Sequence, residues 1–303
     1  MVMHGDLTDD VLAGRLRVLL ASSPDVIQRA ASQQRITIER QLSDGYTNSN
    51  YLLRCGERRC VLRLGNPAAA RLGINRAREQ AIWRSAASAG LSPKLLAFDE
   101  AVGDAVSVFI DAPSAADLLA SGESLSSVQL ARLLKRIHSL PAVASSGSTV
   151  DSSPTRNIDR YVALRKHAGL HWPGWLATLQ ARLKRVHADA PAVTLTHHDF
   201  NPWNVLVGRD GQNLMLDWEY AELGDPMFDL VSAFVHWNMN AEARNELLAA
   251  CDVGTDASTH IASLECLFHL REFTWAGAML ALGSKNLNVQ EQWDREADWL
   301  TRW

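Results

Sequence analysis

The sequence predicts an α+β protein with two lobes, a small N-terminal lobe built on an antiparallel sheet and a larger C-terminal lobe that is mostly helical. Short apolar runs of strand length lie within residues 35–110, whereas apolar spacing typical of helices dominates from residue 125 onward. The polar, proline-containing segment 111–114 separates the two patterns. A chain of 303 residues is long enough for two hydrophobic cores. We therefore expect lobes at residues 1–111 and 112–303.

The N-terminal lobe is expected to contain leading helices, a strand-rich stretch, one inserted helix and two further strands. Apolar residues on one helical side predict the helices, and short β-branched or aliphatic runs flanking polar turns predict the strands. In chain order we expect amphipathic helices within 7–31, strands within 35–64 around a turn at 56–59, a helix at 72–89, and strands at 95–98 and 105–110.

The C-terminal lobe is expected to be helical except for one hairpin. A helix at 125–140 should end at Pro141, because proline cannot continue a helix. A serine-rich loop follows at 142–156. The remaining expected elements are helices at 157–168 and 176–189, hairpin strands at 205–207 and 214–216, and helical stretches at 226–250, 256–283 and 287–302.

Composition narrows the class of protein. No apolar run approaches the roughly 20 residues that a bilayer-spanning helix requires, and no basic segment followed by an apolar one lies near Met1. We therefore expect a cytoplasmic protein with no membrane partner. The four cysteines lack the C-x-x-C spacing of metal or redox motifs, so we expect free thiols. No basic face with interleaved aromatic residues indicates a nucleic-acid partner, and the oligomeric state is left open.

The charge is distributed unevenly along the chain. Residues 191–303 contain 17 acidic and 6 basic residues, a net charge of −11, so the preceding 190 residues carry +7 of the total −4. A basic N-terminal part suits an anionic nucleotide, and an acidic C-terminal part suits a cationic second substrate. The alternative is that the acidic helical surfaces serve solubility alone.

One motif carries most of the chemical information. Residues 197–204 read HHDFNPWN, the pattern H-x-D-x-x-x-x-N, and Asp217 follows Asn204 by thirteen residues after a predicted hairpin. Phosphoryl transfer from MgATP needs one carboxylate at the substrate hydroxyl, together with an amide oxygen and a second carboxylate on magnesium. We therefore predict that Asp199 is the catalytic base and that Asn204 and Asp217 bind Mg²⁺, brought together by the hairpin.

The residues around this motif are expected to support it. His197 is predicted to orient the loop through hydrogen bonds, and His198 has no assigned role. Asp225 precedes Pro226, as expected for a helix N-cap followed by proline at the first helical position. Asp229 is placed to brace the loop from below.

A second candidate segment lies between two predicted strands. Residues 43–50 read SDGYTNSN, and a tight turn there could direct backbone N–H groups at phosphates. The segment is not a G-x-G-x-x-G loop, so a simple polar hairpin turn is the alternative. If it binds nucleotide, the contacting residues are expected to be Gly45, Thr47 and Asn48.

Two charged residues and a hinge complete the predicted nucleotide site. Arg63 lies near the end of a predicted strand, at the position where a protein kinase carries its phosphate-binding lysine, and a guanidinium can do the same work. Glu79 on the following predicted helix would pair with Arg63 and hold it in place. The adenine is expected at the hinge that runs from Phe109 to Ala112.

Four motifs together resemble those of the aminoglycoside phosphotransferase and choline/ethanolamine kinase superfamily, whose fold is two-lobed and protein-kinase-like. The motifs are GYTNSNY at 45–51, VLR at 61–63, INRARE at 74–79 and LDWEY at 216–220, and they are most similar to bacterial choline kinase-like and thiamine kinase-like members. The resemblance covers roughly residues 41–240.

This resemblance implies ATP and Mg²⁺ as cofactors and a small hydroxyl compound as substrate. It implies that Asp199 is catalytic, that Asn204 and Asp217 bind metal, that Arg63 contacts the nucleotide phosphates, and that Glu219 lies near the metals or substrate. The chain departs from the family at position 44, where an Asp stands in place of a frequent second glycine.

The acceptor is expected to be cationic. Nine of the ten tryptophans lie beyond residue 170, and aromatic faces bind quaternary ammonium groups. Trp237 and Trp275 are the predicted substrate contacts. Choline or ethanolamine is preferred as acceptor and thiamine comes next. The alternatives are an aminoglycoside or sugar phosphotransferase of the same fold, and a nucleotide-binding module without catalysis.

Overall fold

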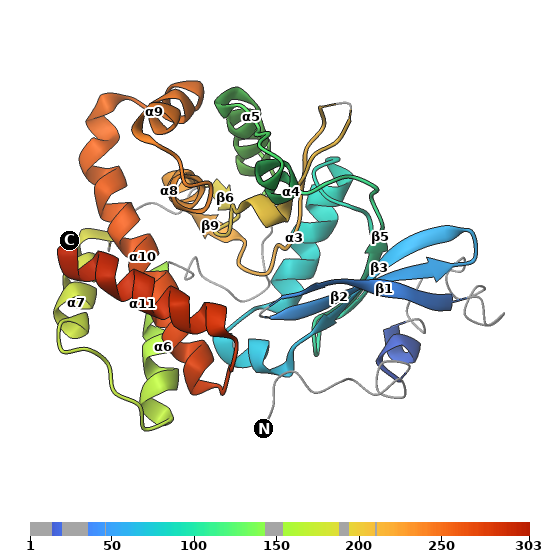
Figure 1. The fold of residues 1–303 in the computed structure, drawn as a ribbon, viewed down its shortest axis with the longest axis horizontal. Helices are drawn as coiled ribbons and strands as arrows, with labels where there is room; N and C mark the ends of the chain where they lie inside the picture. The colour runs from blue at the N-terminus through green and yellow to red at the C-terminus, as the bar shows by residue number, and fades with distance from the viewer. Residues whose placement is uncertain (1–13, 20–35, 46, 143–153, 188–193, 210) are drawn as a thin grey trace. The chain divides into compact units, whose positions relative to one another are not determined.

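The computed structural model describes residues 14–19, 36–45, 47–142, 154–187, 194–209 and 211–303 (Figure 1). Contacts between Cα atoms divide the chain into two compact units. The first, which we call the sheet unit, comprises Gly5–Pro113 and Leu206–Glu219, and the second, the helical unit, contains Ser114–Val205 and Tyr220–Trp303. The division near residue 113 lies close to the expected one at 111/112, but the hairpin belongs with the sheet unit.

Three hydrogen bonds explain why the hairpin segment joins the sheet unit. The backbone N–H of Val207 donates to the carbonyl of Pro113 at 2.9 Å, and that of Met215 donates to the carbonyl of Leu91 at 2.7 Å. The indole of Trp218 donates to the hydroxyl of Ser92 at 3.1 Å. These bonds connect positions far apart in sequence, so the sequence-based boundaries of 1–111 and 112–303 remain a prediction that differs from the contact-based units in this segment.

The sheet unit is built on a five-stranded antiparallel sheet of order β1-β2-β3-β5-β4. Its core contains Leu53, Leu62 and Val106, all completely buried, and Leu19 from the helical residues 14–19 packs in the same cluster. The rest of the predicted helices at 7–31 lie outside the described residues. The strands are β1 (Ile36–Asp44), β2 (Asn48–Cys55), β3 (Arg58–Gly65), β4 (Leu95–Asp99) and β5 (Asp104–Val108).

The inserted helix α3 (Arg76–Ser88) begins later than expected. The prediction of 72–89 fails at its start because Pro67–Leu72 form a 3-10 helix and Gly73 has φ 84°, which breaks the helical path. The side chain of Asn75 then caps α3 by accepting the backbone N–H of Arg78. This capped start fixes the position of Arg76 and Glu79 in the first turn.

The helical unit confirms the prediction of a mostly helical second part. The long helix α10 (Ser258–Ala281) packs against α6 (Pro154–His167), α11 (Leu287–Arg302) and α8 (Pro226–His236) (Figure 1). The other helices are α4 (Ala115–Ala120), α5 (Ser127–His138), α7 (Leu176–His187) and α9 (Ala241–Ala250). Among the described residues, no helix combines the length and apolar character needed to cross a membrane.

Three differences from the predicted elements have local causes. The stretch expected at 226–250 is two helices, because Asn238 adopts φ 48° and Asn240 caps α9 through its side chain. Helix α6 begins at Pro154, inside the predicted serine-rich loop, as expected for proline in a first turn. The predicted N-cap at Asp225 is confirmed, since its carboxylate accepts the backbone N–H of Met227 at 2.9 Å.

Two short strands and a hairpin lie next in sequence to the loop of residues 197–204, which we call the central loop. Strands β6 (Thr194–Thr196) and β9 (Glu222–Gly224) form an antiparallel pair that the sequence did not reveal. The hairpin strands β7 (Val205–Leu206) and β8 (Leu214–Met215) pair as predicted, although each is shorter than expected. Strand β6 leads directly into the H-x-D-x-x-x-x-N motif.

Candidate active site

The central loop brings Asp199 and Asn204 together within the helical unit. One carboxylate oxygen of Asp199 accepts from the amide of Asn204 at 2.9 Å, and the other accepts from the amide of Asn201 at 2.9 Å. Asn201 also caps the 3-10 helix Pro202–Asn204 by accepting the backbone N–H of Asn204. The Asp199 side chain is 24% exposed. A carboxylate that is held on both sides and still open to solvent can receive a proton from a bound alcohol.

Asp229 on α8 braces the loop from below, which confirms the predicted structural role. Its carboxylate is completely buried and accepts the backbone N–H groups of His197 at 2.9 Å and His198 at 2.7 Å. A ring nitrogen of His138 lies 2.9 Å from the same carboxylate. Burial alone would raise the pKa of Asp229, but the hydrogen bond with His138 and the nearby imidazoles outweigh it and lower the pKa to about 2. The brace is therefore a charged carboxylate at neutral pH.

His198, which the sequence left without a role, shapes the turn before Asp199. Its backbone has φ 64°, a left-handed conformation that is costly for a residue with a side chain. The ring is 1% exposed, and Nε2 lies 2.7 Å from the hydroxyl of Thr196. His197 is also fully buried, and its backbone is held by Asp229. Both histidines are therefore buried, and the predicted role of the His197 side chain in orienting the loop remains a prediction.

Arg271 is a loop contact that the sequence did not reveal. Its Nη1 group donates to the carbonyl of His198 at 2.6 Å, although 73 residues separate the two positions. The guanidinium packs over the rings of Phe228 and Phe268, with its central carbon 5.0 and 5.1 Å from the ring centroids. Burial acts to lower the pKa of Arg271, but Glu272 and Asp199 act more strongly and raise it. Arg271 thus keeps a positive charge beneath the loop.

His236 is a second unpredicted neighbour of Asp199. Its Nε2 atom lies 3.8 Å from Oδ1 of Asp199, and its ring packs edge-on against Phe268 at 5.3 Å. This separation exceeds hydrogen-bond length, so His236 contributes an imidazole face near the carboxylate without fixing it. Its position as the last residue of α8 was not recognisable from the motif spacing.

The sheet unit confirms the predicted pair of Arg63 and Glu79. Their side chains form an ion pair at 2.5 Å and are almost completely buried. Burial alone would lower the pKa of Arg63, but the Glu79 and Asp217 carboxylates raise it, so its charge is secure. Nη1 of Arg63 also lies 3.6 Å from Oδ1 of Asp217. The predicted phosphate-binding arginine and one predicted metal ligand are therefore neighbours.

Glu219 belongs to the same network, and its predicted place near the metals or substrate remains a prediction. Its Oε1 accepts from the hydroxyl of Thr47 at 2.8 Å, and its Oε2 accepts from the amide of Asn48 at 3.0 Å and from Arg76 at 3.1 Å. Arg76 also pairs with Glu79 at 2.7 Å. Arg76 was not recognisable from the sequence as part of the site, because only the folded chain brings Glu219 to it.

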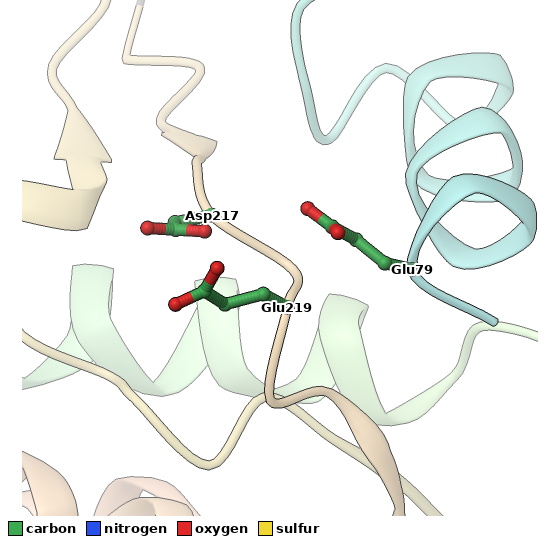
Figure 2. A group of neighbouring side chains, drawn as sticks. All are labelled: Glu79, Asp217 and Glu219. Atoms are coloured by element: carbon green, nitrogen blue, oxygen red, sulfur yellow. The ribbon is translucent and has the colours of Figure 1, made fainter. Parts of the chain in front are cut away.

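Three carboxylates converge in this unit. Figure 2 shows Glu79 reaching from α3 toward Asp217 and Glu219, which follow β8. One ligand atom from each lies within 4.8 Å of the others, a spacing compatible with a shared metal ion. Oxygen donors of this kind suit magnesium. The Asp217 side chain is 32% exposed, whereas Glu79 and Glu219 are buried, so the residue best placed to meet a solvated ion is Asp217.

The remaining predicted nucleotide residues are placed as follows. The backbone N–H of Gly45 donates to the carbonyl of Asn48 at 2.9 Å, and a Cβ at Gly45 would lie 2.9 Å from that carbonyl oxygen, which explains the glycine. Phe109 is half-buried, with the Arg59 guanidinium 5.9 Å from its ring centroid. Ala112 donates its backbone N–H to Ile110 at 3.0 Å. Adenine binding at this hinge remains a prediction.

The two predicted substrate tryptophans differ in their surroundings. Trp237 is 8% exposed, stacks on Phe200 with centroids 6.0 Å apart, and donates its indole N–H to the Phe200 carbonyl at 3.1 Å. These are packing contacts beneath the central loop. Trp275 is half-buried and donates to the hydroxyl of Tyr220 at 3.2 Å. Of the two, Trp275 has the surface that a ligand could contact.

The predicted metal ligands fall in different units, Asn204 in the helical unit and Asp217 in the sheet unit. Each of the two side chains is chemically suited to bind a metal ion. In Asn204 the amide nitrogen is committed to Asp199, so its oxygen is the atom that would face a cation. Their joint binding of one ion remains a prediction.

Comparisons with known proteins agree with this chemistry. A model of the phosphotransferase enzyme family matches residues 39–257. Protein LicA from Haemophilus influenzae is 24% identical over 209 residues, which cover 67% of this chain and 60% of that relative. The matched part of the chain thus spans less than two thirds of that relative's length.

Solved structures share the fold. Choline kinase LicA from Streptococcus pneumoniae superimposes with a TM-score of 0.71 and 20% identity, covering 91% of this chain and 97% of that one. A thermostable mutant of aminoglycoside phosphotransferase APH(4)-Ia, in a ternary complex with AMP-PNP and hygromycin B, gives a TM-score of 0.64 and 19% identity, covering 92% and 98%.

These findings confirm the predicted resemblance and the two-lobed, protein-kinase-like fold class. The family match also agrees with the predicted phosphotransferase class of enzyme. The family match includes the Arg63–Glu79 pair, the Asp199 loop and Asp217. Because it extends over more than half of the 303 residues, the protein belongs to the phosphotransferase enzyme family.

Proposed function

We propose that this protein is an ATP- and Mg²⁺-dependent kinase that transfers the γ-phosphate to the hydroxyl of a small cationic metabolite. Choline or ethanolamine is the preferred acceptor, and thiamine comes next. The observation that carries the proposal is the geometry of Asp199, which is held by Asn201 and Asn204 and remains partly exposed. Since the reaction consumes ATP, we place it in the cytoplasm.

The proposed mechanism assigns one task to each residue. The hydroxyl of the acceptor donates a hydrogen bond to Asp199, and its oxygen bonds to the γ-phosphorus as the bond to the β–γ bridging oxygen breaks and ADP leaves. Asp199 takes the hydroxyl proton during this step. Arg63, charged and fixed by Glu79, would bind the phosphates. Asn204 and Asp217 would hold magnesium, which supplies charge neutralisation on the phosphate oxygens.

Three observations support a cationic acceptor. The relatives of similar fold include a choline kinase, and the C-terminal part of the chain is acidic. A positively charged alcohol would be attracted toward such a surface, and the partly exposed ring of Trp275 is suited to an ammonium group.

An ADP-release assay with choline, ethanolamine and thiamine tests the proposal. We expect turnover with at least one of them and loss of turnover in Asp199→Asn, which keeps the size of the side chain and removes its basicity. If the wild-type protein binds MgATP but phosphorylates none of the three, the substrate assignment is wrong.

The second candidate is an aminoglycoside or sugar phosphotransferase, which the similarity to APH(4)-Ia favours. Aminoglycosides are polycations and would meet the same acidic surface. Adding hygromycin B and a neutral sugar to the same panel separates this candidate from the first. ATP binding without transfer to any alcohol would instead indicate a nucleotide-binding module without catalysis.

A further inference from the structure

Glu219 has both carboxylate oxygens engaged by side chains of its own unit. Oε1 accepts from Thr47, and Oε2 accepts from Asn48 and Arg76. Thr47 and Asn48 are 171 to 172 residues away in sequence and lie where the turn after β1 enters β2. One buried carboxylate therefore ties that turn to the segment that carries Asp217, two residues earlier.

Arg76 connects this carboxylate to the nucleotide-binding pair. Its Nη1 group lies 2.7 Å from Oε2 of Glu79 and 3.1 Å from Oε2 of Glu219. Arg63 occupies the other oxygen of Glu79. Without Arg76, the two buried carboxylates would face each other without a shared counterion, which is strongly unfavourable in a site removed from water.

Four of the five charged side chains in this cluster neutralise one another. Arg63 and Arg76 neutralise Glu79 and Glu219, and all four are buried. Asp217 is the fifth charge, and it is the most exposed of the three carboxylates. By distance alone the three carboxylates could form a metal site. By their partners, Glu79 and Glu219 are committed to arginines at short range, whereas Asp217 lies 3.6 Å from Arg63 and is the most exposed of the three.

We propose that Arg76 is a positioning residue that fixes Glu219 as a strut between the Thr47–Asn48 turn and Asp217, so that magnesium binding depends on the nucleotide turn being in place. The inference deepens the proposed function and rests on it for the identity of the metal–nucleotide complex. Residues that orient metal ligands through such contacts typically change metal affinity about 10- to 100-fold when they are removed.

A purely structural ion-pair network makes a different prediction. In that case the loss of Arg76 would lower the free energy of unfolding and leave the magnesium requirement of the folded protein unchanged. If Arg76 positions Glu219, the Mg²⁺ concentration needed for half-maximal turnover rises in protein that is still folded. The factor by which this concentration rises is larger than the factor by which kcat at saturating Mg²⁺ falls.

The experiment uses the full chain with Arg76→Met, Glu219→Gln and the double variant. Arg84→Met is the matched control, since Arg84 is an exposed arginine on the same helix. Two quantities are measured in each protein: the Mg²⁺ concentration for half-maximal turnover at saturating ATP, and the Mg²⁺ dependence of ATP binding by calorimetry. The second measurement requires no turnover.

We expect Arg76→Met and Glu219→Gln each to raise both magnesium midpoints about tenfold or more. The double variant should resemble the single ones rather than multiply their effects, because both substitutions break the same contact. Arg84→Met should match the wild type. A tenfold shift in only one of the two single variants, or additive effects in the double variant, would overturn the inference.

Two outcomes distinguish this inference from the proposed function. If no alcohol is phosphorylated but the binding midpoints shift as expected, the positioning role stands and the substrate proposal fails. If turnover is normal and Arg76→Met leaves both midpoints unchanged, the positioning role fails. Should Arg76→Met not fold, Thr47→Val removes one hydrogen bond to Glu219 without removing a charged partner, and an unchanged midpoint in that variant overturns the inference.

Discussion

Replacing Asp229 with asparagine should separate the brace beneath the central loop from the chemistry above it. Asp229→Asn keeps the shape of the side chain, but one of its two oxygens becomes an NH₂ group. In the wild type, the two oxygens accept the backbone N–H groups of His197 and His198. In the variant, an NH₂ donor must therefore face a backbone donor or the ring of His138.

The magnitude follows from the number and type of bonds lost. A hydrogen bond to a charged group contributes about 1.5–3 kcal/mol to stability, and breaking a buried charged pair costs about 3–5 kcal/mol. Asparagine retains one acceptor, so roughly half of the interaction survives. We expect Asp229→Asn to lower the free energy of unfolding by about 3 kcal/mol at neutral pH. Turnover should fall as well, because the backbone that leads to Asp199 loses its support.

The pH dependence provides an independent check. The pKa of Asp229 is lowered from 3.8 to about 2, so the folded state favours the charged form and the group stabilises the fold above pH 3.8. This contribution, about 2.4 kcal/mol from the size of the shift, is lost as the pH falls through 3.8 toward 2. By pH 3 about half of it should be gone, and Asp229→Asn should lack this part of the acid sensitivity.

Urea unfolding followed by tryptophan fluorescence at pH 7, 4 and 3 measures both effects. Asp252→Asn is the control, because Asp252 is 82% exposed and pairs with Lys135 at the surface. We expect less than about 0.5 kcal/mol from the control. The reasoning is refuted if Asp229→Asn unfolds within 1 kcal/mol of wild type at pH 7, or if their difference does not narrow between pH 4 and pH 3.

Three further substitutions test the loop and the tryptophan-rich core. Asp199→Ala should lower kcat by about 10²- to 10⁴-fold with little change in the KM for ATP, and near-normal turnover in the ADP-release assay would contradict its role as base. Asn201→Ala removes the donor to Oδ1 of Asp199 and should lower kcat about tenfold in the same assay, because the carboxylate is less well oriented. Gly277→Ala would place a Cβ 2.3 Å from Trp293 and 2.5 Å from Trp172, so thermal unfolding should show a loss of about 1–3 kcal/mol, and an unchanged melting temperature would contradict the close packing.

The elements of the site that could be predicted from the sequence are those whose spacing carries the chemistry. Asn204 lies five positions after Asp199, and this short span nearly determines that the two side chains meet. To predict the Arg63–Glu79 pair, it was enough to know that a helix carrying Glu79 follows a strand carrying Arg63. Asp229 was predictable as a brace because it lies in the first turn of a helix that begins with a recognisable cap.

The contacts that escaped prediction join distant parts of the chain. Arg76 meets Glu219 across 143 residues, and Arg271 meets His198 across 73. Nothing in the local pattern distinguishes Arg76 from Arg78, which lies two positions further along the same helix. In the folded chain Arg76 is only 8% exposed and contacts two carboxylates. Both properties depend on how the sheet packs against α3. Helical periodicity cannot supply that information.

The acidic C-terminal sequence shows the same limit of sequence-based prediction, here for the charge of the acceptor. Several of its carboxylates are already paired in the helical unit: Glu272 accepts from Arg271 and Gln292, and Glu296 lies 2.6 Å from a ring nitrogen of His269. Paired carboxylates contribute to the long-range field but offer little to a bound ammonium group. A count of charges therefore overstates the local negative potential. The proposed preference for a cation would then depend chiefly on Asp199 and on exposed aromatic surface. A neutral isostere of choline that keeps its hydroxyl is therefore the sharpest comparison substrate.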